Sequence, residues 1–522
     1  MDIAPLVSIG QFPQHLGFRR QPSGLNIASD TISREFVAIK AGSSAQGILI
    51  HSGDGGLFIG DAYDCPIAGG ALMGAPEKLI CNSIVVSEAM GCAETTALGT
   101  NLRRRESRPP RERGILARTP SWLRHGSSRS WFCMVRSALL SALVPFGLAA
   151  CATPDQPDSF YRSDPLSVGA RPGDVLRSDP LAGAPDGAKA WRVVYVSTGL
   201  DGRPLAISGI VIVPQGIPPA AGREVVAWGH STTGVAANCA PSMTGNVFAT
   251  ILGLSPLLAD GYVVVASDYP GLGVAGPPSY LVGISEGRAL LDSVRAVRRL
   301  PQAAAGRRYA LWGQSQGGHA ALFAGQIAPS YAPELQLVGV AAAAPPTELG
   351  ATIKADIGSQ AGNIIASYAL LSWSRLYGTP LHTVVAEKAL PIMNRVAGDC
   401  AQTLGDQLLI SVHEAEFDPG ILVADPATAK PWHELLARNS PGHAPIHAPL
   451  YIVQGDADKI VPPLVTAAFV AELCKRGETV QFETVAGAGH MTAGEHSAST
   501  AAAWIRDRFE RSPAPNDCAV RS

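Results

Sequence analysis

From residue 191 onward, the apolar residues fall into short runs that alternate between two spacings. Continuous apolar and β-branched runs, typical of buried strands, occur at 193–197, 206–213, 225–228, 262–266, 309–312, 337–344, 450–453 and 480–485. Apolar residues that recur every three or four positions, typical of helices, occur at 285–300, 319–327, 464–474 and 497–509. The first two strands flank the turn Asp201-Gly202-Arg203-Pro204, which predicts a hairpin. Strands that alternate with helices predict an α/β fold, with a mostly parallel sheet and helices on both faces.

The stretch from residue 345 to 446 is too long to be a simple loop in a compact domain. It contains two helical patterns, at 364–376 and 383–396. We therefore expect this stretch to form a helical cap, inserted over the carboxyl edge of the sheet.

Residues 1–133 do not share this regular pattern. Nine arginines and no lysine lie between Leu102 and Trp131, where prolines also interrupt any helix. One interpretation is a basic arm for nucleic acid or another anionic surface. The interpretation we favour is a disordered segment, or upstream sequence that is not normally translated.

A secretory signal is predicted immediately after this segment. Met134-Val135-Arg136 is a basic start, residues 137–150 are mostly apolar, and small residues precede Cys151. The ending Leu148-Ala149-Ala150-Cys151 resembles the bacterial lipoprotein signal, which implies that Cys151 is lipidated and attaches the mature protein to a membrane. The alternative is a buried helix. Because a signal this far along the chain cannot act in the ordinary way, we expect translation to begin at Met134. The predicted segments are thus 1–133, 134–151, 152–190, a folded domain at 191–512 with its cap at about 345–446, and a tail at 513–522.

Composition narrows the class of protein. Charged residues make up 16% of the chain and hydrophobic residues 46%, whereas an average domain has about 25% charged residues. The formal net charge of −2 supplies no chain-wide basic field for nucleic acid. No run reaches the roughly 18 apolar residues of a membrane span. Of the cysteines, Cys239, Cys400, Cys474 and Cys518 remain in the mature part beyond Cys151, and they allow three pairings. We favour Cys239–Cys400 with Cys474–Cys518.

Two stretches match the pattern Gly-x-Ser-x-Gly, which presents a nucleophilic serine on a sharp turn from strand to helix. The first is centred on Ser285 and the second on Ser315. Ser315 follows the predicted strand 309–312 and precedes two glycines and a helix, so we choose it as the nucleophile. Ser285 follows a loop, and we interpret it as the cap of a helix whose first turn contains Glu286.

A serine nucleophile needs a histidine to remove its proton and a carboxylate to orient that histidine. After such a turn, the chain order is serine, acid and then histidine. Asp458 follows the predicted strand 450–453, and His490 follows the strand that ends at Val485. Both are expected in loops at the carboxyl ends of strands, where open α/β sheets place their chemistry. Asp456 and His496 are the rival residues.

The oxyanion of a tetrahedral intermediate needs preorganised N–H donors. We expect one from the backbone of Gln316, the residue after the nucleophile. The other is expected from the glycine-flanked loop after strand 225–228, where Ser231 and Thr232 are the candidates.

Several of these motifs together resemble the secretory lipase family, over about residues 191–509. The resemblance rests on the sequences Ala227-Trp228-Gly229-His230-Ser231-Thr232-Thr233-Gly234, Cys239-Ala240-Pro241-Ser242, Asp268-Tyr269-Pro270-Gly271-Leu272-Gly273, Leu291-Asp292-Ser293-Val294-Arg295-Ala296 and Gly313-Gln314-Ser315-Gln316-Gly317-Gly318-His319. It implies an α/β-hydrolase fold, a helical cap that binds the acyl chain, and hydrolysis of carboxylic esters without a metal or other cofactor. Residues 1–133 have no counterpart in this resemblance.

The function expected from the sequence is therefore a serine hydrolase that cleaves acylglycerols or similar apolar esters. The partner is a small-molecule or lipid ester, and nucleic acid is not expected. The alternatives are a serine peptidase, an acyltransferase on the same scaffold, and a non-catalytic surface protein. Apolar cap residues could line an acyl pocket or form the core of the cap: Tyr368, Leu370, Leu371, Trp373 and Tyr377.

Overall fold

The computed structural model describes residues 34–41, 44–53, 56–62, 158–162, 164–167, 169–402 and 421–518. The chain divides into two compact units, one within Ile3–Val144 and the other within Pro145–Ser522. The predicted signal segment with Cys151, and the arginine-rich segment before it, lie outside the described residues.

The described part of the first unit is an antiparallel sheet of three strands in the order β1–β2–β3. Its strands are β1 (Arg34–Ala41), β2 (Ser44–Gly53) and β3 (Gly56–Ala62). We predicted no element in this range, because its apolar runs are short and glycine-rich and hold no sustained period.

The described part of the second unit is built on a nine-stranded sheet in the order β12–β11–β10–β9–β7–β8–β6–β5–β4. The strands from β12 to β8 run parallel, and β6, β5 and β4 continue the sheet with antiparallel pairs. The bounds are β4 (Val175–Leu181), β5 (Ala188–Thr198), β6 (Pro204–Pro214), β7 (Arg223–Gly229), β8 (Val263–Ser267), β9 (Ala305–Gln314), β10 (Gln336–Ala343), β11 (Leu450–Gly455) and β12 (Val480–Val485). The predicted mostly parallel sheet and the β5–β6 hairpin are confirmed.

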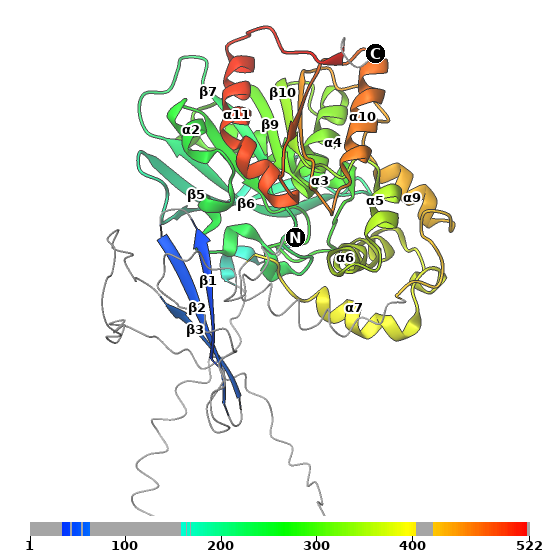
Figure 1. The fold of residues 1–522 in the computed structure, drawn as a ribbon. Helices are drawn as coiled ribbons and strands as arrows, with labels where there is room; N and C mark the ends of the chain where they lie inside the picture. Colours follow the sequence, from blue (N-terminus) through cyan, green and yellow to red (C-terminus); the bar gives the residue numbers. More distant parts are fainter. Residues whose placement is uncertain are drawn as a thin grey trace, which may run out of the picture. The chain divides into compact units, whose positions relative to one another are not determined.

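Helices cover both faces of this sheet (Figure 1). Alternate residues of a strand point to opposite faces, so Val225 and Ala227 of β7 join one buried cluster, while Val226 and Trp228 join another. The first cluster also contains residues of α3 (Gly283–Arg298), α4 (Gln316–Tyr331) and α10 (Pro463–Lys475). The second contains residues of α2 (Leu254–Ala259) and α11 (His490–Phe509). Short 3₁₀ turns lie in the connections: η3 (Ser159–Tyr161), η4 (Ala237–Cys239), η5 (Pro241–Met243), η6 (Val247–Thr250) and η7 (Pro301–Ala303).

The chain between β10 and β11 forms the helical insertion. Its described elements are α5 (Leu349–Asp356), α6 (Gln360–Tyr377), η8 (Leu381–Thr383), η9 (Glu387–Ala389), α7 (Leu390–Val396) and α9 (Trp432–Asn439). These elements share their own buried cluster, which also contains Tyr280, Leu281 and Val282 from the loop before α3. We call this insertion the cap from here on. None of the helices in the described part of the chain has the length and apolar character needed to cross a bilayer.

Three local predictions are wrong. The predicted helix at 383–396 is instead two 3₁₀ turns and the short α7, because Val385 forms an isolated antiparallel bridge with Leu422. Helix α3 begins at Gly283 with Val282 as its N-cap residue, so Ser285 lies inside the first turn of the helix and is not its N-cap. Helix α11 begins at His490, which therefore opens a helix rather than lying in a loop.

Two disulfides close loops in the described domain. Cys239 bonds to Cys400 and Cys474 bonds to Cys518, so the pairing that we favoured is confirmed.

The glycines of the first Gly-x-Ser-x-Gly match have a packing role. A Cβ on Gly283 would lie 2.2 Å from the Phe323 ring, and one on Gly287 would lie 2.9 Å from the Ala324 backbone nitrogen. Both contacts are between α3 and α4, so these glycines allow the two helices to approach closely. This explains why the motif occurs here without a strand-to-helix turn.

We predict that Gly287→Val lowers the free energy of unfolding by about 2–3 kcal/mol, because its side chain overpacks the contact between α3 and α4. Chemical denaturation followed by circular dichroism measures the change. Ser285→Ala is the matched control, because it lies two residues before Gly287 in the same helix and removes atoms rather than adding them. Equal stability of Gly287→Val and the wild type would contradict the close contact.

Candidate active site

Ser315 lies between β9 and α4 on a strained turn. Its backbone has φ 55° and ψ −120°, a region that non-glycine residues rarely adopt. The turn is possible because no side chain separates its walls: a Cβ on Gly313 would lie 2.2 Å from the Gly317 carbonyl oxygen. The Ser315 amide donates to the Ala343 carbonyl at 2.8 Å, which fixes the turn to the end of β10. The serine side chain is thereby held beyond the carboxyl edge of the sheet.

The three predicted triad residues meet in one hydrogen-bonded chain. Ser315 Oγ lies 2.7 Å from His490 Nε2, and His490 Nδ1 lies 2.8 Å from Asp458 Oδ2. His490 and Asp458 are buried, whereas Ser315 is partly exposed. The serine is therefore the member that a substrate can reach.

The Asp458 carboxylate is surrounded by hydrogen-bond donors. Oδ1 accepts from the backbone amides of Ile460 at 2.8 Å and Val461 at 2.9 Å, and Oδ2 also accepts from Gln454 Nε2 at 2.8 Å. Burial alone would raise the pKa of Asp458, but the hydrogen bond and charge of His490 and the two amides together lower the pKa below its ordinary value. The carboxylate therefore stays ionised next to the imidazole.

The rival residues are not part of this hydrogen-bonded chain. Asp456 and His496 are both exposed, and Asp456 Oδ1 accepts from the Gly487 amide at 2.6 Å. Asp456 thus joins the loops after β11 and β12.

The loop after β7 lies directly beside the nucleophile. Within the sheet, β7 has β8 as its neighbour on one edge and β9 on the other. The chain therefore leaves β7 for β8 and later returns to the opposite edge of β7 as β9. Loops diverge at such a switch point and leave room for a ligand. A Cβ on Gly317 would lie 1.9 Å from the Gly229 carbonyl oxygen, so the two backbones are in contact.

The predicted oxyanion donors are brought together at this contact. Gln316 is the first residue of α4, and its amide has no intrahelical partner because it precedes the first full turn. Ser231 Oγ lies 3.4 Å from the Gln314 carbonyl, and Thr232 Oγ1 lies 2.9 Å from Tyr280 Oη.

A buried polar network supports the loop after β7. The Asp268 carboxylate accepts from Ser208 Oγ at 2.6 Å, from the Ser242 amide at 3.0 Å and from Ser242 Oγ. The Asp268 carbonyl lies 3.3 Å from His230 Nε2, and His230 Nδ1 lies 2.6 Å from the Ser231 carbonyl. Burial lowers the pKa of His230 to about 4, so the ring is neutral at pH 7.

The cap contacts the same loop at two places. Trp373 Nε1 of α6 donates to the Tyr280 carbonyl at 3.0 Å, and Tyr280 in turn contacts Thr232. Cys400 is covalently bonded to Cys239, and the Ala401 amide donates to the Thr233 carbonyl at 2.9 Å. The apolar cap residues that we singled out are buried or partly buried in the cap cluster: Tyr368, Leu370, Leu371, Trp373 and Tyr377.

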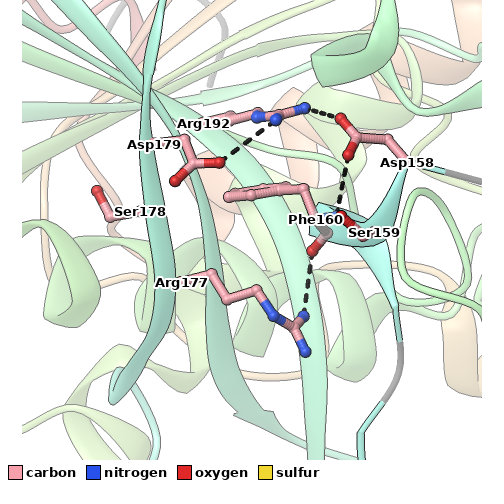
Figure 2. A pocket seen from close by; sticks show the side chains of 7 residues that line it. All are labelled: Asp158, Ser159, Phe160, Arg177, Ser178, Asp179 and Arg192. Atoms are coloured by element: carbon pink, nitrogen blue, oxygen red, sulfur yellow. Dashed lines mark hydrogen bonds and ion pairs between the residues drawn. The ribbon is translucent and has the colours of Figure 1, made fainter.

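A separate cavity of about 440 Å³ lies beside the N-terminal segment, and its lining is polar (Figure 2). Arg192 bonds to Asp158 and to Asp179, and its guanidinium lies 4.2 Å from the centre of the Phe160 ring. Arg177 Nη1 donates to the Phe160 carbonyl at 3.1 Å. These contacts hold residues 158–162 against β4 and β5, and no proposed catalytic residue lines this cavity.

Several polar residues that support the site were not predicted. Gln454 orients Asp458, and Gln314 Nε2 donates to the carbonyls of His490 at 3.1 Å and Met491 at 2.8 Å. Each glutamine lies near the end of a strand that leads to a triad residue. Position alone was the available signal, because a glutamine in an apolar strand does not by itself indicate which partner it meets.

Comparison with known proteins agrees with the fold. The family model described as Secretory lipase matches residues 238–517, which is more than half of the chain. Lipase A of Arthroderma benhamiae is 28% identical over 391 residues, which cover 68% of this chain and 80% of that protein. A secreted triacylglycerol lipase of Malassezia globosa is 27% identical over 380 residues, covering 67% and 79%.

The solved structure of Candida antarctica lipase A has the same fold, with a TM-score of 0.57 and 22% identity over 67% of this chain and 84% of that one. The sheet order, the covering helices and the inserted cap define an α/β-hydrolase fold. The match to the secretory lipase family shows that the protein hydrolyses carboxylic esters. The chain belongs to the secretory lipase family, as the sequence resemblance predicted, and it is an exported protein.

The buried carboxyl of Asp268 leads to a prediction about stability and pH. Burial raises the pKa of Asp268 to about 6, although hydrogen bonds from Ser208 and Ser242 act in the opposite direction. The folded protein therefore holds this proton more tightly than the unfolded chain, whose carboxyl keeps its ordinary pKa of 3.8. The contribution of the Asp268 proton to the free energy of unfolding is fully present below about pH 4. It is lost as the pH rises to about 6, which lowers the free energy of unfolding by about 3 kcal/mol in all.

Asp268→Asn removes this dependence. We expect the difference in unfolding free energy between wild type and Asp268→Asn to change between pH 4 and 6 and to be constant above pH 7. Urea denaturation at unit pH steps measures the difference, with the exposed Asp456→Asn as the control. A difference that does not vary from pH 4 to 6 would show that the folded-state pKa of Asp268 is not raised.

Proposed function

We propose that Ser315, His490 and Asp458 form the catalytic triad of this ester hydrolase. His490 Nε2 takes the proton from Ser315 Oγ as that oxygen attacks the ester carbonyl and forms the tetrahedral intermediate. The intermediate collapses when His490 returns the proton to the leaving alcohol. Asp458 holds the imidazole by its Nδ1 hydrogen and stabilises the imidazolium. A water molecule, deprotonated by His490, then attacks the acyl-enzyme, and His490 returns that proton to Ser315 Oγ as the acid is released.

The oxyanion is proposed to bind two backbone amides. One is the amide of Gln316, and the other is that of Ser231 or Thr232. Support comes from the backbone contact between Gly317 and Gly229, which sets the loop after β7 beside the nucleophile. The helix α4 also points its amino terminus at this position, so its dipole favours the negative charge.

The observation that carries the proposal is the continuous chain of short contacts from Ser315 through His490 to Asp458. Each of the three side chains comes from the end of a different strand. A core contact would bury all three, whereas here only the nucleophile is partly exposed.

The substrate is proposed to be an apolar carboxylic ester, such as an acylglycerol. Relatives named lipase A and triacylglycerol lipase support this class. The contacts beside the proposed oxyanion loop also support it, because the Tyr280 hydroxyl contacts Thr232 and Trp373 of the cap donates to the Tyr280 carbonyl. We propose that the acyl chain lies along this side of the cap.

Ser315→Ala should reduce ester hydrolysis by about 10⁴-fold or more, because nucleophilic catalysis is lost while the fold remains. Asp458→Asn should reduce kcat by about 10⁴-fold through loss of imidazole orientation. Both variants are assayed on an ester series from acetate to long-chain triglyceride, and labelling by a fluorophosphonate reports the nucleophile directly. Ser285→Ala, from the other Gly-x-Ser-x-Gly stretch, should keep full activity. Turnover retained in Ser315→Ala, or labelling at another residue, would refute the assignment.

We also propose that export uses the signal at 134–151 and that Cys151 is lipidated, which anchors the enzyme to a membrane. The sequence Leu148-Ala149-Ala150-Cys151 supports this proposal. In it, translation begins at Met134 and the mature protein begins at Cys151.

Cys151→Ser is then expected to abolish incorporation of labelled palmitate and to move the enzyme from the membrane fraction to the soluble fraction of a bacterial host. Cys133→Ser, just upstream of the proposed start, is the matched control. Palmitate incorporation in Cys151→Ser, or abundant peptides from residues 1–133 in the native protein, would contradict the proposal.

A further inference from the structure

A buried pair of ionisable residues lies behind the nucleophile turn. Glu286 of α3 and His319 of α4 are completely buried. Glu286 Oε1 accepts from the Leu281 amide at 2.9 Å and from Gln316 Nε2 at 2.7 Å, and Glu286 Oε2 lies 3.3 Å from His319 Nδ1. The carboxylate therefore faces three groups at once, and one of them belongs to the residue that follows the nucleophile.

The second ring nitrogen of His319 faces the cap. His319 Nε2 lies 2.7 Å from the carbonyl of Asn439, the last residue of α9, so it must donate there. A bare Nδ1 would then present a lone pair to the Glu286 carboxylate. The contact is satisfied only when one proton lies between Nδ1 and Oε2. Asn439 Oδ1 also accepts from the Gly283 amide at 3.2 Å, which joins the cap to the start of α3.

Gln316 has two separate tasks in this arrangement. Its backbone amide is the proposed oxyanion donor, whereas its side chain is bonded to Glu286. The Gln316 side chain is buried, and its Oε1 has no hydrogen-bond partner among the described residues. The bond from Nε2 to Glu286 is therefore the polar contact that holds this side chain in place.

A buried ion pair contributes little net stability compared with an apolar pair of the same volume, because desolvation offsets the attraction. A merely structural role is therefore a weak explanation for two ionisable groups at this place. A role in positioning explains why the pair contacts the first turn of α4 and the cap together.

We propose that Glu286, held by His319, is a positioning residue that fixes Gln316 through its side chain and so aims the oxyanion donor. This inference rests on the proposed function, because it assumes that the Gln316 amide binds the oxyanion. The pair acts through hydrogen bonds rather than through its charge.

Glu286→Gln distinguishes a role of the Glu286 hydrogen bonds from a role of its charge. The new Oε1 can accept from Leu281 and Gln316 as before, and the new Nε2 can donate to a neutral His319 at Nδ1. Every hydrogen bond is kept while the charge is lost. We therefore expect kcat within about threefold of the wild type.

Gln316→Met tests the anchor itself. It keeps the backbone amide and the side-chain volume, and it leaves Glu286 with its Leu281 and His319 contacts. We expect kcat to fall about 10- to 100-fold with KM within about threefold, since an oxyanion donor acts mainly in the transition state. The inhibition constant of a trifluoromethyl ketone, which Ser315 converts to an oxyanion adduct, should rise by the same factor. Gln316→Ala, which shortens the side chain, serves if the methionine variant does not fold.

Gln326→Met is the matched control on the same helix. Gln326 also joins α4 to a distant segment, through Ala444 at 2.9 Å and Gly442 at 3.1 Å, but it lies away from the nucleophile. Its kcat and inhibition constant should match the wild type. Thermal melting establishes that each variant is folded.

The positioning role is overturned if folded Gln316→Met retains wild-type kcat and ketone affinity, or if Glu286→Gln loses as much activity as Gln316→Met. A KM increase at unchanged kcat would overturn it too, because that pattern means lost ground-state binding. Failure of the proposed function looks different: wild-type enzyme would then resist both the fluorophosphonate and the ketone at Ser315.

Discussion

The backbone contact between Gly317 and Gly229 is the constraint on which the proposed site depends. A Cβ on Gly317 would lie 1.9 Å from the Gly229 carbonyl oxygen, so any side chain there would push the two loops apart. One loop presents Ser315, and the other presents the candidate oxyanion donors Ser231 and Thr232. Their separation is thus set by a direct nonbonded contact between backbone atoms rather than by flexible side chains. Preorganisation of this kind costs nothing when the reaction occurs.

Around this contact, the site is held by buried amides and carboxylates. Gln454 orients the acid, Gln314 holds the backbone of the base, and Gln316 lies against Glu286. Each glutamine follows or ends a buried strand, where its side chain leaves the apolar layer and meets the next loop. Neutral amides suit this position, because they can form hydrogen bonds there without the cost of desolvating a charge.

The strand and helix pattern could be predicted because the buried parallel strands and amphipathic helices have distinct periods. The order of Ser315, Asp458 and His490 followed from the same pattern, since each residue comes just after a strand. Helix starts were less predictable: α11 begins at His490, where Gly489 precedes it without a side-chain cap. The prediction of a helix at cap residues 383–396 was wrong for another reason: a β-bridge from Val385 to Leu422 overrides the helical spacing of their apolar residues. From the sequence, Glu286 was interpreted as a favourable charge at the amino terminus of its helix. No local pattern indicated its hydrogen bond to Gln316, which lies thirty positions further along the chain.

The disulfide between Cys239 and Cys400 gives the cap a dependence on its surroundings. It joins the cap to the segment that follows the loop with Ser231 and Thr232. The two cysteines are 161 residues apart in the sequence. Such bonds persist in oxidising compartments and are kept reduced in the cytosol. The cap and this loop are therefore tied covalently only after the chain has left the cell interior. Reduction of this one bond would leave the cap and the loop joined by noncovalent contacts alone, so the rigidity of the site depends on the redox state of the surroundings.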